Sequence, residues 1–273
     1  MEYNHCFIRL GRLRLLLPMI LVAILIGIRW IFAASGPHYS VVDLGRSDSA
    51  YILRQQRDGN IVHIFIASKP YGEVGWIRAQ GRNTSHAFLR RGGQFEDLGT
   101  LGGKRSYAWD LNAYGWVVGY SQLADQGHHA FLFHGSLMDD LGTLGGTNSQ
   151  ARGINDQGQI VGDADTPQGM RHAFLWEKFR MKDLGTLGGG LESVATSMNN
   201  KGDIVGYAMP LYADKHAVLW QQGTMYDLNE QILPDSGWEL VEAVKIDDAG
   251  SIWGNGKLHG RWRRFMLRPL KKL

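Results

Sequence analysis

The chain contains one cysteine, Cys6, which lies close to the N-terminus. The rest of the chain is therefore free of thiols and cannot be held together by a disulfide framework. Proline is also scarce, at seven of 273 residues, whereas 36 residues are glycine. This balance indicates a chain with many tight turns rather than a proline-rich disordered polymer.

An excess of one charge is missing once the N-terminal leader is set aside. The whole chain has a formal net charge of +3, but four of its 29 basic and one of its 26 acidic residues lie in the first 34 positions. The remainder carries 25 residues of each sign. Proteins that bind nucleic acids need a basic surface to neutralise phosphates. The neutral body therefore predicts that nucleic acid is not a partner.

The leader has the layout of an export signal. Three arginines precede the uncharged run LLLPMILVAILIGI at residues 15–28, and small residues follow near Ala33–Ser35. Residues 1–34 fit either a cleaved signal peptide or an uncleaved anchor, because residues 15–34 are long enough to span a bilayer as a helix. Arg29, directly after the apolar run, slightly favours the anchor. In both cases we expect an exported protein, periplasmic or extracellular, with any membrane contact made by this helix.

The body repeats itself with a constant period. HAFL begins at His86, His129 and His172, and HAVL begins at His216, at spacings of 43, 43 and 44 residues. DLG or DLN begins 11 residues after each of these histidines. A third segment, G-x-[IV]-[VW]-G, recurs in the same phase, with degenerate copies of all segments at both ends. The chain is therefore a repeat protein.

Each period contains four short extended runs, which we name strands A to D. In the third copy they are SQARGIN (149–155), QIVGDA (159–164), HAFLW (172–176) and RMKDL (180–184). Gly158 can take a positive φ in the turn between A and B, which predicts a hairpin. Four strands in about 43 residues is the size of a propeller blade.

The ends of the chain suggest how the repeats close. The last copy has strands A (241–247), B (251–255) and C (262–268) but no D, whereas YSVVDLG near residue 40 is an isolated D strand. Pairing of residues 39–44 with the last repeat would leave no unpaired edge. The sequence therefore predicts a five-bladed β-propeller over residues 38–273, closed by its N-terminal strand. An open β-solenoid of the same repeats is the alternative.

HAFLW, DLGTLGG and IN-x-x-G-x-I-V-G, in this order, resemble the HAF repeat family of bacterial repeat proteins. The resemblance covers residues 39–269 and implies an extracellular repeat protein. It departs from the family pattern in the first repeat, where HIFIASKP replaces the strand A signature, and at the end, where Arg263 and Arg264 replace His-Ala.

DLGTLGG occurs three times, at residues 97–103, 140–146 and 183–189. A feature present in several repeats is more simply a device that joins blades than a ligand loop. We expect its aspartates to cap the turn and Leu101, Leu144 and Leu187 to wedge between blades. The repeated histidines lie one to a blade, too far apart to share a metal, so we expect each to bond a nearby loop. We predict no metal and no cofactor.

Function is expected where the repeats differ. The B–C connections are variable and polar, and the D–A connection at residues 49–59 carries an insertion on the same face. Polar loops with occasional aromatic residues suit sugars or peptides. The candidate ligand-binding residues are Asn83, Asp125, His128, Asp163, Asp165, Tyr212, Asp214, Asn255 and His259.

These features favour a non-catalytic binding or interaction module, whose ligand is a carbohydrate or another envelope protein. Similar clefts between blades would give such a module multivalent binding. The alternative is a glycosidase-like enzyme, which needs two carboxylates about 5–10 Å apart. Asp163 and Asp165 are the best-placed pair for that chemistry. Aromatic residues facing the clefts would favour the first interpretation, and free paired carboxylates the second.

Overall fold

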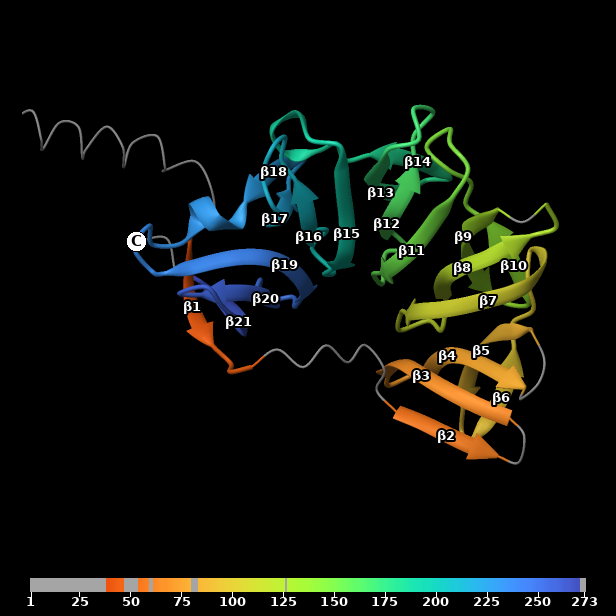
Figure 1. The fold of residues 1–273 in the computed structure, drawn as a ribbon. Coiled ribbons are helices and arrows are strands. Elements are labelled where there is room, and N and C mark those ends of the chain that lie inside the picture. The colour runs from red at the N-terminus through yellow and green to blue at the C-terminus, as the bar shows by residue number, and fades with distance from the viewer. Residues whose placement is uncertain (1–37, 47–53, 59–60, 80–82, 126, 271–273) are drawn as a thin grey trace, which may run out of the picture. The chain divides into compact units, whose positions relative to one another are not determined.

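The strands of the computed structural model form three hydrogen-bonded sheets, of four, nine and eight strands (Figure 1). Each of the two larger sheets contains two groups of antiparallel strands joined by one parallel bridge, and we name the five groups, one to each sequence repeat, sheets 1 to 5. The structure describes residues 38–46, 54–58, 61–79, 83–125 and 127–270. The predicted leader, residues 1–34, lies outside these ranges. No helix in the described ranges is long and apolar enough to cross a membrane. The chain is therefore all-β and propeller-like over the described residues, as the repeat predicts.

The strands follow the chain in order, four or five to a sheet. Sheet 1 contains β2 (Arg54–Asp58), β3 (Ile61–Lys69), β4 (Gly72–Ala79), β5 (Ser85–Arg91) and β6 (Gln94–Asp97). Sheet 2 contains β7 (Gly102–Leu111), β8 (Val117–Leu123), β9 (His128–His134) and β10 (Leu137–Asp140). Sheet 3 contains β11 (Ser149–Ile154), β12 (Ile160–Asp165), β13 (Arg171–Glu177) and β14 (Arg180–Asp183). Sheet 4 contains β15 (Glu192–Met198), β16 (Ile204–Met209), β17 (His216–Gln221) and β18 (Thr224–Asp227). Sheet 5 contains β19 (Trp238–Ile246), β20 (Ile252–Leu258), β21 (Arg261–Pro269) and β1 (Tyr39–Asp43). Two short 3-10 turns, η1 (Leu187–Gly189) and η2 (Leu228–Gln231), follow β14 and β18.

The hairpin between strands A and B forms where the sequence predicts it. Gly158 has a φ of 75°, a conformation that residues with a Cβ rarely adopt. Its N–H donates to the carbonyl of Asn155 at 3.1 Å, and the N–H of Asn155 donates to the carbonyl of Gln159 at 3.1 Å. The glycine therefore sets the tight turn that returns the chain along the sheet.

The N-terminal strand belongs to the last repeat. β1 pairs antiparallel with β21 and lies beside it in Figure 1, so it takes the place of strand D in sheet 5. Tyr39 of β1 is 4% exposed and joins the apolar core between sheets 4 and 5. This pairing is the one that the sequence predicts.

The apolar core is divided among the junctions between neighbouring sheets. Each cluster takes residues from two successive sheets, such as Val118 of sheet 2 with Ile160 of sheet 3. Leu101, Leu144 and Leu187 of the DLGTLGG loops pack against the clusters of the first, second and third junctions. The predicted wedging of these leucines between sheets is confirmed.

A second set of links runs through the A–B turns. The side-chain amides of Asn112, Asn155 and Asn199 each donate to a backbone carbonyl in the A–B turn of the next sheet, at 3.3, 3.3 and 3.0 Å. The last acceptor is the carbonyl of Asp247 in sheet 5. Sheets 2 to 5 are therefore bonded in series at this end.

One expectation is wrong. Residues 49–59 were expected to form a connection on the face that carries the B–C loops, but residues 54–58 form strand β2, which pairs antiparallel with β3. The run RQQRD has little apolar character, so its sequence gives no sign of a strand. Its backbone is ordered by the neighbouring edge of β3.

Candidate functional site

The repeated histidines and aspartates are paired with each other, which accounts for both. In sheets 1 to 4 the Nδ1 atom of each HAF or HAV histidine lies 2.6–3.0 Å from a carboxylate oxygen of the aspartate 11 residues later. One carboxylate oxygen also accepts the backbone N–H two residues on, as in Asp140 to Gly142 at 2.8 Å. The predicted turn capping is confirmed, and the predicted loop partner of each histidine is this aspartate.

A buried serine fixes each of the first three junctions. Ser149 accepts the backbone N–H of Ala130 at 2.8 Å and donates to the carbonyl of Gly142 at 2.5 Å. Ser106 and Ser193 make the same two bonds in their own junctions. DLGTLGG therefore joins sheets, and its polar groups are used within the fold.

The repeats differ at a position directly after a glycine that they share. The second glycine of G-x-[IV]-[VW]-G precedes five residues of four kinds, which are Trp76, Tyr120, Asp163, Tyr207 and Asn255. A Cβ on Gly162 would lie 1.9 Å from the carbonyl oxygen of Gln150 in strand A. Gly119 and Gly206 meet the same obstacle, and a β-bulge lies next to each contact. The glycine thus lets strand A approach closely and places the variable side chain beside it.

Four of these variable residues, in sheets 1 to 4, form one continuous line of contacts with their neighbours, which we name the variable row. It consists of Trp76, Tyr107, Tyr120, His128, Gln150, Arg152, Asp163, Arg171, Glu192, Tyr207 and Lys215. Every member contacts the next, from sheet 1 to sheet 4. None of them belongs to a HAF, DLG or TLGG segment. The contacts that these repeated segments make therefore do not depend on which residues stand in the row.

The first part of the variable row is aromatic. The rings of Trp76 and Tyr107 meet edge to face with centroids 5.3 Å apart, and Tyr107 stacks on Tyr120 at 4.9 Å. The ring of His128 lies 5.3 Å from that of Tyr120. Burial raises the pKa of Tyr120 to about 12, so its hydroxyl keeps its proton and remains a donor at neutral pH. Burial lowers the pKa of His128, which favours the uncharged ring.

The second part is an ion network. Arg152 Nε lies 2.5 Å from Asp163 Oδ1, and Arg171 Nε lies 3.8 Å from Asp163 Oδ2. Arg171 also contacts Glu192 and donates to the hydroxyl of Tyr207 at 2.6 Å. Burial would raise the pKa of Glu192, but the charge and hydrogen bond of Arg171 lower it, so this carboxylate is ionised. Two guanidinium groups therefore form ion pairs with two carboxylates, and the four charges balance.

The row ends beside sheet 5. Lys215 Nζ lies 4.0 Å from the centroid of the Tyr207 ring, a cation–π contact. Burial raises the pKa of Glu242 in β19, and the positive charges of Lys215 and Arg152 act against that rise. Aromatic residues thus lie in the first, second and fourth junctions, and an arginine-bound aspartate lies in the third.

The structure brings some of the predicted residues together and separates the others. His128 and Asp163 belong to the variable row, and Asn255 holds the equivalent position in sheet 5. Asn83 accepts a hydrogen bond from Arg105, and Asp165 accepts two from Asn148 at 3.1 and 2.9 Å. Asp125 and His259 are exposed and make no ion pair among the described residues. Two of the nine candidate residues therefore belong to the variable row.

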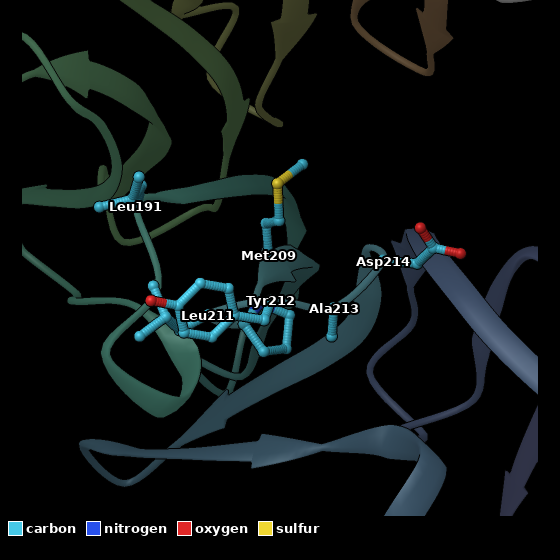
Figure 2. Close-up of a pocket in the computed structure, with 7 residues that line it drawn as sticks. Leu191, Met209, Leu211, Tyr212, Ala213 and Asp214 are labelled. Atoms are coloured by element: carbon cyan, nitrogen blue, oxygen red, sulfur yellow. The ribbon is translucent and has the colours of Figure 1, made fainter.

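Tyr212 and Asp214 are not members of the row and lie at a pocket of about 630 Å³ lined by residues 209–214 and Leu191 (Figure 2). Tyr212 is 97% exposed, and its φ of 63° is rare for a residue with a Cβ. Leu191 and Leu211 beside it are 59% and 48% exposed. The carboxylate of Asp214 lies 3.8 Å from Lys257 Nζ and points away from the tyrosine ring. This surface is apolar and shallow.

The predicted carboxylate pair is not free to act as acid and base. Asp163 is 3% exposed and bound to two arginines, and Asp165 holds the amide of Asn148. In the part of the chain that the structure describes, no three His, Cys, Asp or Glu side chains are grouped to hold a metal.

Sequence reasoning missed the residues of strand A, namely Tyr107, Gln150 and Arg152, and the aromatic Trp76 of strand B. They lie within strands, whereas the search for variable residues was made in the connections. Alignment of the five repeats on the second glycine would have found Trp76, Tyr120, Asp163 and Tyr207 together, because unlike residues follow an identical one.

No family model and no curated protein matches the chain. Three solved structures are similar to it at low identity. TolB from Acinetobacter baumannii is 12% identical with a TM-score of 0.48, over 97% of this chain and 72% of that one. The catalytic domain of a GH62 α-L-arabinofuranosidase from Coprinopsis cinerea is 9% identical with a TM-score of 0.34, over 86% and 98%. A gluconolactonase from Xanthomonas campestris is 10% identical with a TM-score of 0.34, over 86% and 99%.

Proposed function

We propose that the chain is an exported or membrane-anchored, non-catalytic binding module of the HAF repeat type, and that its ligand is a carbohydrate. Its fold is a five-bladed propeller in which β1 completes the last blade. The observation that carries the proposal is the variable row. Eleven polar and aromatic side chains of eight residue types are held in contact by a backbone that otherwise repeats.

The chemistry of the row suits sugars. Saccharide sites combine aromatic surfaces with a small number of fixed hydrogen-bonding groups. Trp76, Tyr107 and Tyr120 supply the aromatic surface, and the neutral His128 and the side-chain amide of Gln150 supply donors and acceptors. Because the ring contacts hold these side chains against one another, little side-chain freedom is left to lose on binding.

A glycosidase is less well supported. Acid–base catalysis on a glycosidic bond needs one carboxyl group that holds a proton and one that is free to act. Asp163 and Glu192 are both neutralised by Arg171, and Arg152 binds Asp163 as well. Both carboxylates are therefore engaged in ion pairs within the protein, and neither is free to act on a substrate.

The test is binding of the purified full-length chain, in mild detergent, to an array of neutral and acidic glycans and cell-wall polysaccharides. We expect retention of one glycan class, and its loss in the Tyr120→Ala variant. Tyr226→Ala, in strand D of sheet 4, is the control that should bind normally. A folded protein that retains no glycan contradicts the proposal.

A protein partner in the envelope is the second candidate, and the surface around Tyr212 favours it. Leu191, Leu211 and Tyr212 present apolar side chains to solvent next to one another around the pocket of Figure 2. Exposed apolar surface of this kind is common at protein interfaces. Cross-linking from position 212 in native cells should capture a partner if this candidate holds. Cross-linking from position 157, which lies in the A–B turn of sheet 3, should capture none.

A further inference from the structure

We propose that the sheet 1–sheet 2 end of the variable row binds the carboxylate of an acidic sugar, with Arg105 as the group that recognises it. This inference rests on the proposed carbohydrate-binding function and names its ligand class. A uronate-type sugar carries both features that this end of the row matches, a ring with apolar C–H groups and a single carboxylate.

Arg105 differs from the arginines of the ion network in its partner. Arg152 and Arg171 are each bound to a carboxylate, at Asp163 and Glu192. The guanidinium of Arg105 donates to the neutral side-chain amide of Asn83, and among the described residues no carboxylate lies within 4 Å of it. A guanidinium has five N–H groups in a planar fork. The amide uses part of that fork and leaves the positive charge uncompensated.

The position of Arg105 brings its charge to the aromatic residues. It lies two residues before Tyr107 in β7, beside the irregular pairing between Gly102 and Ser106. Tyr107 lies opposite Tyr120 in β8. The positive charges of Arg105 and Arg152 both act to lower the pKa of Tyr120 against the effect of burial.

A second cation lies at the same place. Arg78 follows Trp76 by two residues in β4 and therefore shares its face. It pairs in register with Ser85, and Ser85 forms the parallel bridge to Arg105. Arg78 is exposed, and no ion pair is found for it in the described ranges. Among the described residues neither Arg78 nor Arg105 has an acidic partner, and each lies two positions along its strand from an aromatic member of the row.

Charge balance along the row points the same way. The ion network contains Arg152 and Arg171 with Asp163 and Glu192, which cancel. The aromatic end has Arg78 and Arg105, for which the described part of the chain holds no carboxylate within 4 Å. An ionised carboxylate is the group that such a fork binds most strongly, through two parallel hydrogen bonds. Because Arg105 is half-buried, its ion pair with a ligand carboxylate would be screened less by salt than an ion pair on the surface.

The experiment compares three ligands that share one backbone. β-1,4-linked glucuronate oligomers, the matched glucose oligomers and the methyl esters of the glucuronate oligomers are titrated into the full-length chain in detergent by calorimetry. The ester keeps the sugar and removes the charge. We expect the acid to bind at least tenfold more tightly than the other two, with an affinity that falls as salt is raised.

Variants then assign the effect to Arg105. Arg105→Gln should reduce acid binding to the level of the ester and leave glucose binding unchanged, and Arg105→Lys should restore part of it. Arg268→Gln, an exposed arginine of β21, is the matched control and should bind as the parent does. Circular dichroism and thermal unfolding report whether each variant is folded, and the ester comparison needs no variant.

The outcomes separate the two proposals. Equal affinity for acid, ester and glucose oligomer overturns the role of Arg105 and leaves the carbohydrate function standing. The same follows if Arg268→Gln loses as much acid binding as Arg105→Gln, because the attraction is then unspecific. Absence of binding to every glycan overturns both proposals.

Discussion

Asp43 of β1 lies opposite Phe265 of β21. In the other repeats Asp97 lies opposite Phe88 and Asp183 opposite Phe174, so the N-terminal strand repeats the register of an ordinary strand D. Arg263 stands where those repeats have histidine, and its Nε lies 3.8 Å from the carboxylate of Asp43. A basic residue thus faces the aspartate in all five sheets. In sheet 5 the aspartate comes from β1, whereas the basic residue comes from β21.

If β1 is an integral part of sheet 5, loss of its buried side chain should be costly. Tyr39 is 4% exposed and packs in the core between sheets 4 and 5. We expect Tyr39→Ala to lower the free energy of unfolding by about 3–5 kcal/mol, in the range found for large aromatic residues in cores. Urea denaturation at pH 7 measures it. Ser40→Ala, on the exposed face of the same strand, should change it little. Equal effects would show that β1 is not packed.

The same tyrosine predicts instability in alkali. Burial, with the charge of Asp203, raises the pKa of Tyr39 to about 12 from an ordinary value of 10. The unfolded chain therefore loses this proton first, so the stabilisation is complete below pH 10 and is lost as the pH rises through 12. The loss is about 2–3 kcal/mol at most. Tyr39→Phe should unfold like the parent at pH 8 and resist urea better than the parent at pH 11. A parallel decline of both proteins contradicts this.

The buried serines should matter more than exposed ones. Ser149→Ala leaves the N–H of Ala130 and the carbonyl of Gly142 without their partner in a closed junction. An unpaired buried group costs about 1–3 kcal/mol, so the free energy of unfolding should fall by about that amount. Ser136→Ala, in an exposed turn of sheet 2, serves as control and should cost less than about 0.5 kcal/mol. Chemical denaturation distinguishes the two.

The glycine before the variable residue should tolerate no side chain. A Cβ at Gly162 would lie 1.9 Å from the carbonyl oxygen of Gln150, which the backbone cannot avoid without moving strand A. Gly142 has a φ of 72° but open space around its Cβ position. We expect Gly142→Ala to cost about 1–2 kcal/mol from backbone strain, and Gly162→Ala to cost more and to weaken ligand binding. The reverse order in thermal unfolding would contradict this account of the glycine.

The regular part of the fold could be predicted because repetition makes local signals agree. Strands, turn glycines, the leucine wedges and the pairing of residues 39–44 with the last repeat all follow from aligning the chain on itself. For the histidine–aspartate pairs, the constant spacing was recognised from the sequence but the contact between the two side chains was not. The spacing of 11 residues is visible in the sequence, but the hairpin that brings the two side chains together has to be built before the contact is evident.

The candidate site was harder to predict because its residues come from different sheets. Tyr107 and Arg152 occupy strand A next to a bulge, and the bulge shifts the alternation of faces, so periodicity alone does not tell which way they point. Contacts such as that between His128 and Gln150 join residues 22 positions apart, and depend on how two sheets meet. Strand β2 was missed for a related reason, since a polar segment becomes a strand through the edge beside it.

Because β1 pairs with β21, the strands of sheet 5 are synthesised at different times. Tyr39 leaves the ribosome before the strands of sheets 1 to 4, and its neighbour Pro269 leaves it after them. Sheets 1 to 4 can each form as their own residues emerge, whereas sheet 5 has to wait for β19 to β21. Until then the early strand carries an unpaired edge, which is open to pairing with other chains. During synthesis β1 therefore stays without its partner strand for longer than any other described strand.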